Sequence, residues 1–503
     1  MKKLLTLLFA LFALSYVQAQ ETENKCGDNL TWSFDESTGT LTIAGDGAMY
    51  DYSSISGTPW YGVKNDIKAV KFTGSPTNIG NFAFNNCYYI TNVVIPSSVT
   101  SIGESAFVGC DFASIEIPDS VKSIGATAFQ RCRALESVTI PEGVTSLGEC
   151  AFEYCSGLTS VVVPSTVTSI GDGIFEQCIS LKSITFANGI KNIGNYMLSG
   201  CRELTNIDIP SSVTNIGNYA LSGCKALESI EIPETVTSIG KGAFRNCGLT
   251  SVKFLASVTS ISENTFDGCT ALTSIKIPEG VTSIGSYALS GCTSLTSVEI
   301  PEGVTSIAEY ALSGCTALTS IEIPEGMINI DSQAFADCTG LTSIKLSSSL
   351  TSIGSYALSG CTSLTSVEIP EGVTSIASGV FSGCNALASI VVDEKNTVYD
   401  SRENCNAIIE TATNTLVAGC NATTIPTSVK SIAAGALNGF TSLTSIKIPD
   451  GVTSIGNSAF AGCTGLTSVE IPKSVTSIGN SFYYCLLLWL VSCNAVLPRL
   501  RCG

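Results

Sequence analysis

One unit of 22 or 23 residues recurs along most of this 503-residue chain. A column of cysteines marks the unit, and its members lie 22 or 23 residues apart from Cys87 to Cys384. After a longer gap the column resumes with Phe440, Cys463 and Cys485, which gives 17 register positions. A period of this length is typical of a solenoid, in which each unit stacks on its neighbours.

The apolar positions within the unit indicate how it folds. The unit that begins at Cys292 reads CTSLTSVEIPEGVTSIAEYALSG. Val298 and Ile300 alternate with polar residues, as in a strand, and Pro301 ends that strand because it cannot donate to a ladder. The V-T-S-I stretch that follows is a second short segment. One unit cannot bury these apolar residues alone, whereas stacked copies bury them in one continuous core.

The consensus C-x-x-L-T-S-[IV]-x-I-P-x-x-V-T-S-I-G-x-x-A-[FL] resembles the leucine-rich repeats of BspA-like bacterial surface proteins, over about residues 75–485. The resemblance implies an α/β-type leucine-rich repeat solenoid, strand-rich and with short helical or 3-10 turns, of about 17 repeats. For function it implies a secreted or surface-displayed binding protein, often an adhesin. It implies no catalytic residues.

Residues 20–74 precede the array and have a different pattern. Apolar and polar residues alternate in 32–34 and 41–43, on either side of a turn at Ser37-Thr38-Gly39. We interpret this segment as a small N-terminal β cap that shields the first coil. Four aromatic residues follow and suit either the core of the cap or a platform for stacking sugars: Tyr50, Tyr52, Trp60 and Tyr61.

An insertion at 393–424 divides the array into residues 75–392 and 425–485. Two strands are predicted in it, at 407–410 and 415–418, on either side of Ala412-Thr413. This pairing sets Ile409 opposite Leu416, and it sets Cys405 opposite Cys420. Directly opposed cysteines in a hairpin suit a disulfide, and an exported chain permits one. Cys405 and Cys420 are therefore a candidate disulfide.

The other cysteines favour packing over chemistry. Sixteen of the 22 occupy the single column, and stacked neighbours are expected ~4.8 Å apart. Parallel Cβ vectors in such a ladder are poorly aimed for a disulfide. The sequence has no C-x-x-C pair of the kind that metal sites use. We predict buried, unreactive thiols, and neither a metal nor another cofactor.

Composition excludes several classes of function. The chain has no histidine, which removes Ser-His-Asp and Cys-His nucleophilic machinery and every zinc site with a histidine ligand. Its net charge of −17 argues against nucleic-acid binding, which needs clustered Lys and Arg. A catalytic pair of carboxyl groups needs one member with a raised pKa. Glu299 and Glu322 come from one position copied in each repeat, with no pocket to raise the pKa of one above that of the other. We predict that the protein is not an enzyme.

The N-terminus predicts export. Lys2-Lys3 precede an apolar run from Leu4 to Val17, and small residues at Val17 and Ala19 suit a cleavage site. Residues 1–19 are therefore predicted to be a signal peptide, and the protein is expected to be secreted and associated with the cell surface. No later stretch approaches the ~20 apolar residues of a transmembrane helix, so the mature chain is expected to lack one.

Residues 486–503 form a tail that is hydrophobic and then basic, with no acidic residue. This tail suits a hydrophobic cap over the last coil, or it marks a broken reading frame. The repeat stops in mid-unit at this point, which favours the second interpretation.

Outward positions must carry any specificity, because the core uses the inward ones. In the first strand, the residue between the two alternating apolar residues carries both signs of charge across the middle of the array. These residues are the candidate ligand-binding face: Asp208, Glu231, Lys253, Lys276, Glu299, Glu322, Lys345 and Glu368. A simpler interpretation is that they are solvated positions whose Lys and Glu offset each other.

The predicted function is protein binding or adhesion, to host matrix or to other cells, through this face. Repetition of the unit suits many weak contacts that add up through avidity. One alternative is a structural spacer rod in a cell-surface or biofilm layer. Another is a carbohydrate-binding module that uses the aromatic residues of the N-terminal cap.

Overall fold

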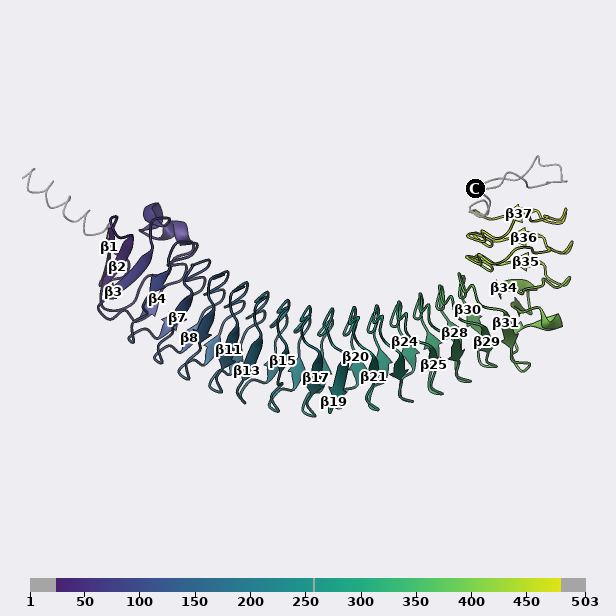
Figure 1. The fold of residues 1–503 in the computed structure, drawn as a ribbon, viewed down its shortest axis with the longest axis horizontal. Helices are drawn as coiled ribbons and strands as arrows, with labels where there is room; N and C mark the ends of the chain where they lie inside the picture. Colours follow the sequence, from purple (N-terminus) through teal and green to yellow (C-terminus); the bar gives the residue numbers. More distant parts are fainter. Residues whose placement is uncertain (1–23, 257, 481–503) are drawn as a thin grey trace, which may run out of the picture. The chain divides into compact units, whose positions relative to one another are not determined.

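The computed structural model describes residues 24–256 and 258–480. The chain divides into two compact units, Met1–Thr235 (unit 1) and Val236–Gly503 (unit 2). Within each unit, coils of the repeat stack in chain order (Figure 1). The predicted signal peptide and the tail at 486–503 lie outside the described residues. No helix in the described part of the chain is long and apolar enough to cross a membrane.

A typical coil has a first strand after the cysteine column, a second strand at the V-T-S-I stretch, and a turn segment that leads to the next cysteine. In unit 1 the first strands are β5 (Asn92–Val93), β7 (Ser114–Glu116), β9 (Ser137–Thr139), β11 (Ser160–Val163), β13 (Ser183–Phe186), β15 (Asn206–Ile207) and β17 (Ser229–Ile232). The second strands of unit 1 are β4 (Asn78–Ile79), β6 (Ser101–Ile102), β8 (Ser123–Ile124), β10 (Ser146–Leu147), β12 (Ser169–Ile170), β14 (Asn192–Ile193) and β16 (Asn215–Ile216).

Unit 2 contains the same two kinds of strand. Its first strands are β19 (Ser251–Phe254), β21 (Ser274–Lys276), β23 (Ser297–Glu299), β25 (Ser320–Glu322), β27 (Ser343–Lys345), β29 (Ser366–Ile369) and β31 (Ser389–Val392). Its second strands are β18 (Ser238–Ile239), β20 (Ser260–Ile261), β22 (Ser283–Ile284), β24 (Ser306–Ile307), β26 (Asn329–Ile330), β28 (Ser352–Ile353), β30 (Ser375–Ile376), β35 (Ser431–Ile432), β36 (Ser454–Ile455) and β37 (Ser477–Ile478).

Strands of neighbouring coils pair in parallel and in register. Ile275 of β21 pairs with Val298 of β23, and Ile307 of β24 pairs with Ile330 of β26. Equivalent residues of successive coils therefore stack, and their apolar side chains form buried columns. The strand-rich solenoid predicted from the repeat is confirmed.

The turn segment differs in detail from the short helical or 3-10 turns that were expected. The N–H of Phe266 donates to the Ala288 carbonyl of the next coil at 2.8 Å, whereas the N–H of Cys269 donates to Phe266 within its own coil. Asn264 and Gly268 have left-handed backbones, with φ of 57° and 71°. Bonds within and between coils thus alternate, and no helix develops because a helix keeps every such bond inside its own segment.

The cysteine column is buried, as predicted. Every cysteine that the structure describes is a free thiol, and within the column each is buried. The thiol of Cys132 donates to the Phe107 carbonyl of the preceding coil at 3.1 Å, and Cys155 donates in the same way to Phe129. Burial raises the pKa of Cys87 and of Cys384 to about 12, so these thiols stay protonated and unreactive.

The N-terminal segment contains the predicted hairpin. β1 (Leu30–Asp35) and β2 (Thr40–Gly45) pair antiparallel, and β3 (Ala69–Thr73) joins β2 in parallel and leads into the first coil. Two 3-10 helices, η1 (Ile55–Gly57) and η2 (Tyr61–Val63), lie between β2 and β3. Trp60 is fully buried and stacks on Phe84 at 5.6 Å, so it belongs to the core. Tyr50 and Tyr61 are exposed.

The insertion contains β32 (Tyr399–Asp400), η3 (Arg402–Asn404), β33 (Ala407–Glu410) and β34 (Thr415–Gly419). β33 and β34 form the predicted antiparallel hairpin, and Ile409 lies opposite Leu416 as predicted. β34 then pairs in parallel with β35 and so rejoins the second-strand column.

The placement of Cys405 directly opposite Cys420 is wrong. The register shifts by one residue between Ile408 and Ile409, so that Ala407 pairs with Gly419. Such a bulge cannot be read from the apolar pattern, because it adds one unpaired residue to one strand. Both cysteines are free thiols in the structure, and Cys420 donates to the Asn406 carbonyl at 3.3 Å.

Candidate functional site

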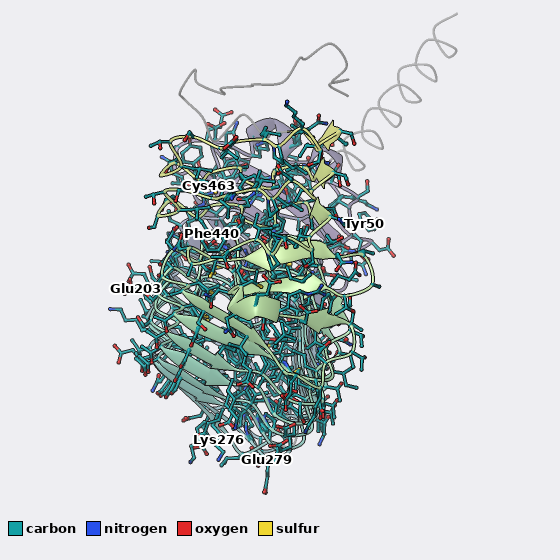
Figure 2. The ribbon with its side chains drawn as sticks, turned by 90° about the vertical axis from the view of Figure 1, so that its right-hand side faces the viewer. Tyr50, Glu203, Lys276, Glu279, Phe440 and Cys463 are labelled. Carbon is teal, nitrogen blue, oxygen red and sulfur yellow. The ribbon has the colours of Figure 1, made fainter. Side chains whose placement is uncertain are left out.

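Within each unit, the predicted ligand-binding residues lie on the outward surface of the first-strand column, which we call the strand face of that unit. Asp208 and Glu231 belong to unit 1, and the other six residues belong to unit 2. All eight side chains are exposed. Inward neighbours such as Ile275 and Ile321 are buried, because successive residues of a strand point to opposite sides. Figure 2 shows Lys276 projecting outward from its coil.

Within unit 2 the charges on the strand face pair across neighbouring coils. Lys276 lies opposite Glu299, and Nζ of Lys276 is 3.2 Å from Oε2 of Glu299. Glu322 lies opposite Lys345 and accepts a hydrogen bond from it, which raises the pKa of Lys345. The Lys276 and Glu299 side chains are each 71% exposed. Pairs as exposed as this contribute little to stability, so either partner can exchange its contact for one with a ligand.

A row of hydroxyls runs beside these charges on the strand face. The Thr296 hydroxyl donates to the Thr273 carbonyl of the preceding coil at 3.0 Å, and Thr342 donates to Thr319 at 2.9 Å. Each of these hydroxyls donates its proton to a carbonyl, and its oxygen can still accept a hydrogen bond from solvent or a ligand. The strand face is therefore polar and locally neutral.

A hollow in unit 1 was not predicted. It has a volume of about 600 Å³, and Arg133, Lys182 and Arg202 line it together with Glu136 and Glu203. Figure 2 shows Glu203 projecting outward at this part of the chain. The sequence signal is present in the segments C-R-A-L and C-R-E-L, which replace the common C-T-S-L after the cysteine. Departures from the consensus, rather than the consensus itself, mark this hollow.

Two pairs of stacked tyrosines in the turn segments were also missed. The rings of Tyr287 and Tyr310 are 4.7 Å apart, and those of Tyr196 and Tyr219 are 5.3 Å apart. All four residues have left-handed backbones, with φ between 53° and 57°. This conformation is uncommon for a bulky residue. The signal was a tyrosine two residues before the buried Leu of successive repeats.

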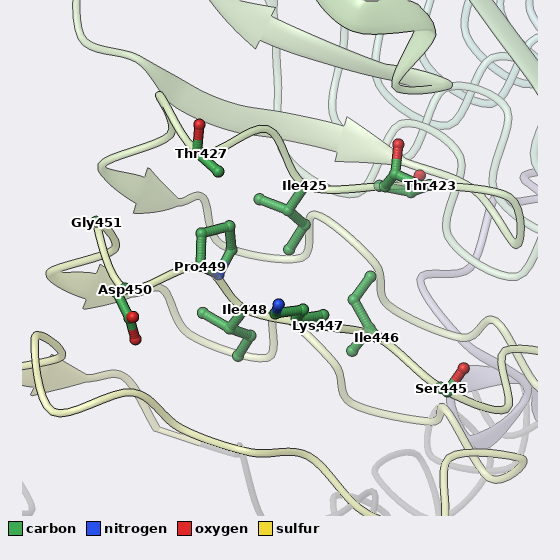
Figure 3. Close-up of a pocket in the computed structure, with 11 residues that line it drawn as sticks. Thr423, Ile425, Thr427, Ser445, Ile446, Lys447, Ile448, Pro449, Asp450 and Gly451 are labelled. Atoms are coloured by element: carbon green, nitrogen blue, oxygen red, sulfur yellow. The ribbon is translucent and has the colours of Figure 1, made fainter.

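A second hollow, in unit 2, adjoins the insertion. It has a volume of about 690 Å³ and lies between residues 423–427 and 445–451. Figure 3 shows Ile425 and Ile446 between the two backbone segments, with Lys447 beside them. Lys447 occupies the same repeat position as Lys276 on the strand face, but its coil has no first strand in the structure.

The comparisons with known proteins agree with this architecture. Six overlapping segments match the BspA type leucine rich repeat region: 54–178, 145–273, 191–319, 259–388, 306–415 and 414–496. No curated protein matches the chain.

Solved structures with similar folds include three bacterial proteins. A leucine-rich repeat protein from Bacteroides ovatus ATCC 8483 is 32% identical, with a TM-score of 0.59, over 69% of this chain and 95% of that one. A leucine-rich repeat protein from Eubacterium ventriosum ATCC 27560 is 30% identical, with a TM-score of 0.47, over 62% and 93%. A leucine rich cell surface protein from Faecalibacterium prausnitzii A2-165 is 23% identical, with a TM-score of 0.43, over 91% and 94%.

The matched repeats cover most of the sequence, and the structure stacks them as the repeat pattern requires. The chain therefore belongs to the BspA-type leucine-rich repeat family.

Proposed function

We propose that this protein is a non-enzymatic binding protein of the cell surface, which adheres to extracellular proteins through its strand face. The observation that carries the proposal is the row of exposed charges in unit 2, which neutralise each other across neighbouring coils. A partner with a complementary row can replace these weak contacts at several coils in succession. Many weak contacts of this kind add up to a specific interaction.

The fold supports binding rather than catalysis. Inward side chains are committed to the core, and the outward face of unit 2 carries hydroxyls and paired charges. Extended surfaces are the usual binding sites of solenoid proteins. Export directed by the predicted signal peptide would bring this surface to extracellular partners such as host matrix or neighbouring cells.

A charge-swap variant tests the proposal without changing net charge. We would exchange both pairs on the strand face, with Lys276→Glu, Glu299→Lys, Glu322→Lys and Lys345→Glu in the full chain. Adhesion to a surface coated with extracellular-matrix extract would be measured as the amount of chain retained. We expect at least a tenfold loss of adhesion, because the swapped face repels the charges that the original face attracts.

A matched control exchanges the ion pair of Lys241 with Glu263, in which the two atoms are 2.7 Å apart. These residues lie at the turn segments of their coils. The control should adhere like the wild type. Equal adhesion by the strand-face variant and the wild type would contradict the proposal. Such a result favours a spacer rod, whereas loss of adhesion only on replacement of the exposed Tyr50 and Tyr61 favours a carbohydrate-binding cap.

A further inference from the structure

Two stretches of the chain have the same sequence and different structures. Residues 272–278 and 443–449 both read LTSIKIP, and in each case the next coil reads LTSVEIP, at 295–301 and at 466–472. Residues 272–278 and 295–301 contain β21 and β23, in which Ser274 pairs with Ser297 and Lys276 with Glu299. The corresponding residues 443–449 and 466–472 contain no strand. Position in the fold, rather than sequence, decides the difference.

The missing ladder shows in the backbone hydrogen bonds. At the start of the first strand, the N–H of Thr296 donates to the Thr273 carbonyl at 2.9 Å, and Ala388 donates to Thr365 at 3.0 Å. In the part of the chain that the structure describes, this series of bonds from one first strand to the preceding coil ends at Ala388. Among the described residues, the N–H groups of 444–448 and 467–471 donate to no backbone carbonyl. These segments therefore present unpaired ladder groups, which are a template for another strand.

The insertion explains why the ladder stops. In the turn segments, Gly383 donates to the Asn438 carbonyl at 3.0 Å, so coils on either side of the insertion stack directly there. In the first-strand column, residues 423–425 occupy the preceding position. They are held toward the insertion, because the Thr424 N–H donates to the Cys405 carbonyl at 3.0 Å and the Thr423 hydroxyl donates to the Asn406 carbonyl at 2.8 Å.

Only the first-strand column opens. The second strands β35, β36 and β37 remain paired in register, with Ser431, Ser454 and Ser477 opposite one another. The resulting hollow of about 690 Å³ lies in the range of sites that enclose a ligand. Its apolar lining is partly uncovered, because Ile425 is half-buried whereas Ile277, at the same repeat position, is 1% exposed.

We propose that this hollow binds an extended peptide segment of a partner protein, which adds as a parallel strand along residues 445–448. Main-chain groups supply the affinity in such β-augmentation, and alternate side chains supply the specificity. The coil at 272–301 shows which peptide fits the same backbone: alternating β-branched apolar residues with an acidic residue beside the lysine, as Glu299 lies beside Lys276. This site does not depend on the strand-face proposal, since it uses other coils and another mode of binding.

Hydrogen exchange in the full chain tests the proposal with an internal control. The amides inside the two LTSIKIP stretches have the same intrinsic chemistry, and the following residues Glu279 and Asp450 distinguish their peptides by mass. We expect the amides of 445–447 to exchange at least a hundredfold faster than those of 274–276. Adding the synthetic peptide LTSVEIP at millimolar concentration should slow exchange at 445–447 and leave 274–276 unchanged.

Two further reagents separate strand addition from other contacts. The peptide methylated on its backbone nitrogens cannot donate to a ladder and should give no protection. Lys447→Glu should weaken binding of LTSVEIP about two- to fivefold, as expected for one exposed ion pair, and a peptide with lysine in place of its glutamate should restore it. Lys473→Glu is the control, because Lys473 is exposed and does not line the hollow.

Three results would overturn the proposal. Protection of 445–447 equal to that of 274–276 before any peptide is added would mean that the ladder is already filled. Absence of added protection with LTSVEIP would mean that the hollow takes up no strand. Equal protection by the methylated peptide would mean that binding does not use the backbone.

Discussion

At the scale of single residues, burial determines the protonation state of the cysteine column, because a buried thiolate would lose its solvation by water. The thiol of Cys384 donates to the Leu358 carbonyl of the preceding coil, and burial raises its pKa from the ordinary value of 9.0 to about 12. The folded state therefore keeps its thiol protons at a pH where the unfolded chain begins to lose them. Stability from this source is complete below pH 9 and is lost as the pH rises toward 12.

We accordingly predict that the free energy of unfolding falls steeply above pH 9. Each thiol with a pKa of about 12 contributes a slope of up to about 1.4 kcal/mol per pH unit. Denaturant unfolding between pH 8 and pH 11 measures the slope, and Cys384→Ala should make it shallower. A free energy of unfolding that stays constant to pH 11 would contradict the assignment of protonated buried thiols.

A second residue-scale prediction concerns the left-handed tyrosines. Tyr310 has φ of 57°, a conformation that glycine adopts without the steric cost that a Cβ brings. Tyr310→Gly should therefore be about 1 kcal/mol more stable than Tyr310→Ala, as measured by denaturant unfolding. The opposite order is expected at Thr293, which is exposed and has no positive φ. The same order at both sites would show that the backbone conformation at Tyr310 costs nothing.

At the scale of elements, the strands that recur in the repeat could be predicted from the sequence, whereas the local irregularities that interrupt the repeat could not. Strands at Val298 and at Ile307 follow from alternation and from Pro301, and most coils repeat them. The bulge between Ile408 and Ile409 depends on one unpaired residue, which leaves no apolar signature. The open ladder at 445–448 could not be predicted from its own residues at all, because the same heptapeptide forms a strand at 274–276.

Deletion of residues 393–425 tests the role of the insertion. The junction would read C-N-A-L-A-S-I-V-V-P-T-S-V-K-S-I, which restores the common spacing from Cys384 to the next column position. We expect a folded chain in which the amides of the former 445–447 are as protected as those of 274–276, and in which LTSVEIP no longer binds. Continued fast exchange at this stretch would mean that the insertion does not cause the opening.

At the scale of the whole molecule, the repeat both builds the core and displays the strand face. One position in the unit, copied along the array, gives a row that carries both Lys and Glu. Because equivalent residues stack in register, Lys276 lies opposite Glu299 and Glu322 lies opposite Lys345 in neighbouring coils. The outward residues of the strand face could be predicted by residue number from this logic, whereas their ion pairs required the structure.

Carboxylate footprinting of the full chain bound to matrix-coated beads tests the central claim most directly. The exposed side chains of Glu299, Glu322 and Glu368 report on the strand face, and those of Glu263 and Glu309 report on the turn segments. We predict that binding lowers the labelling of the first three at least threefold and leaves the last two unchanged. Unchanged labelling of the strand-face glutamates, with protection at Glu263 and Glu309, would contradict the account.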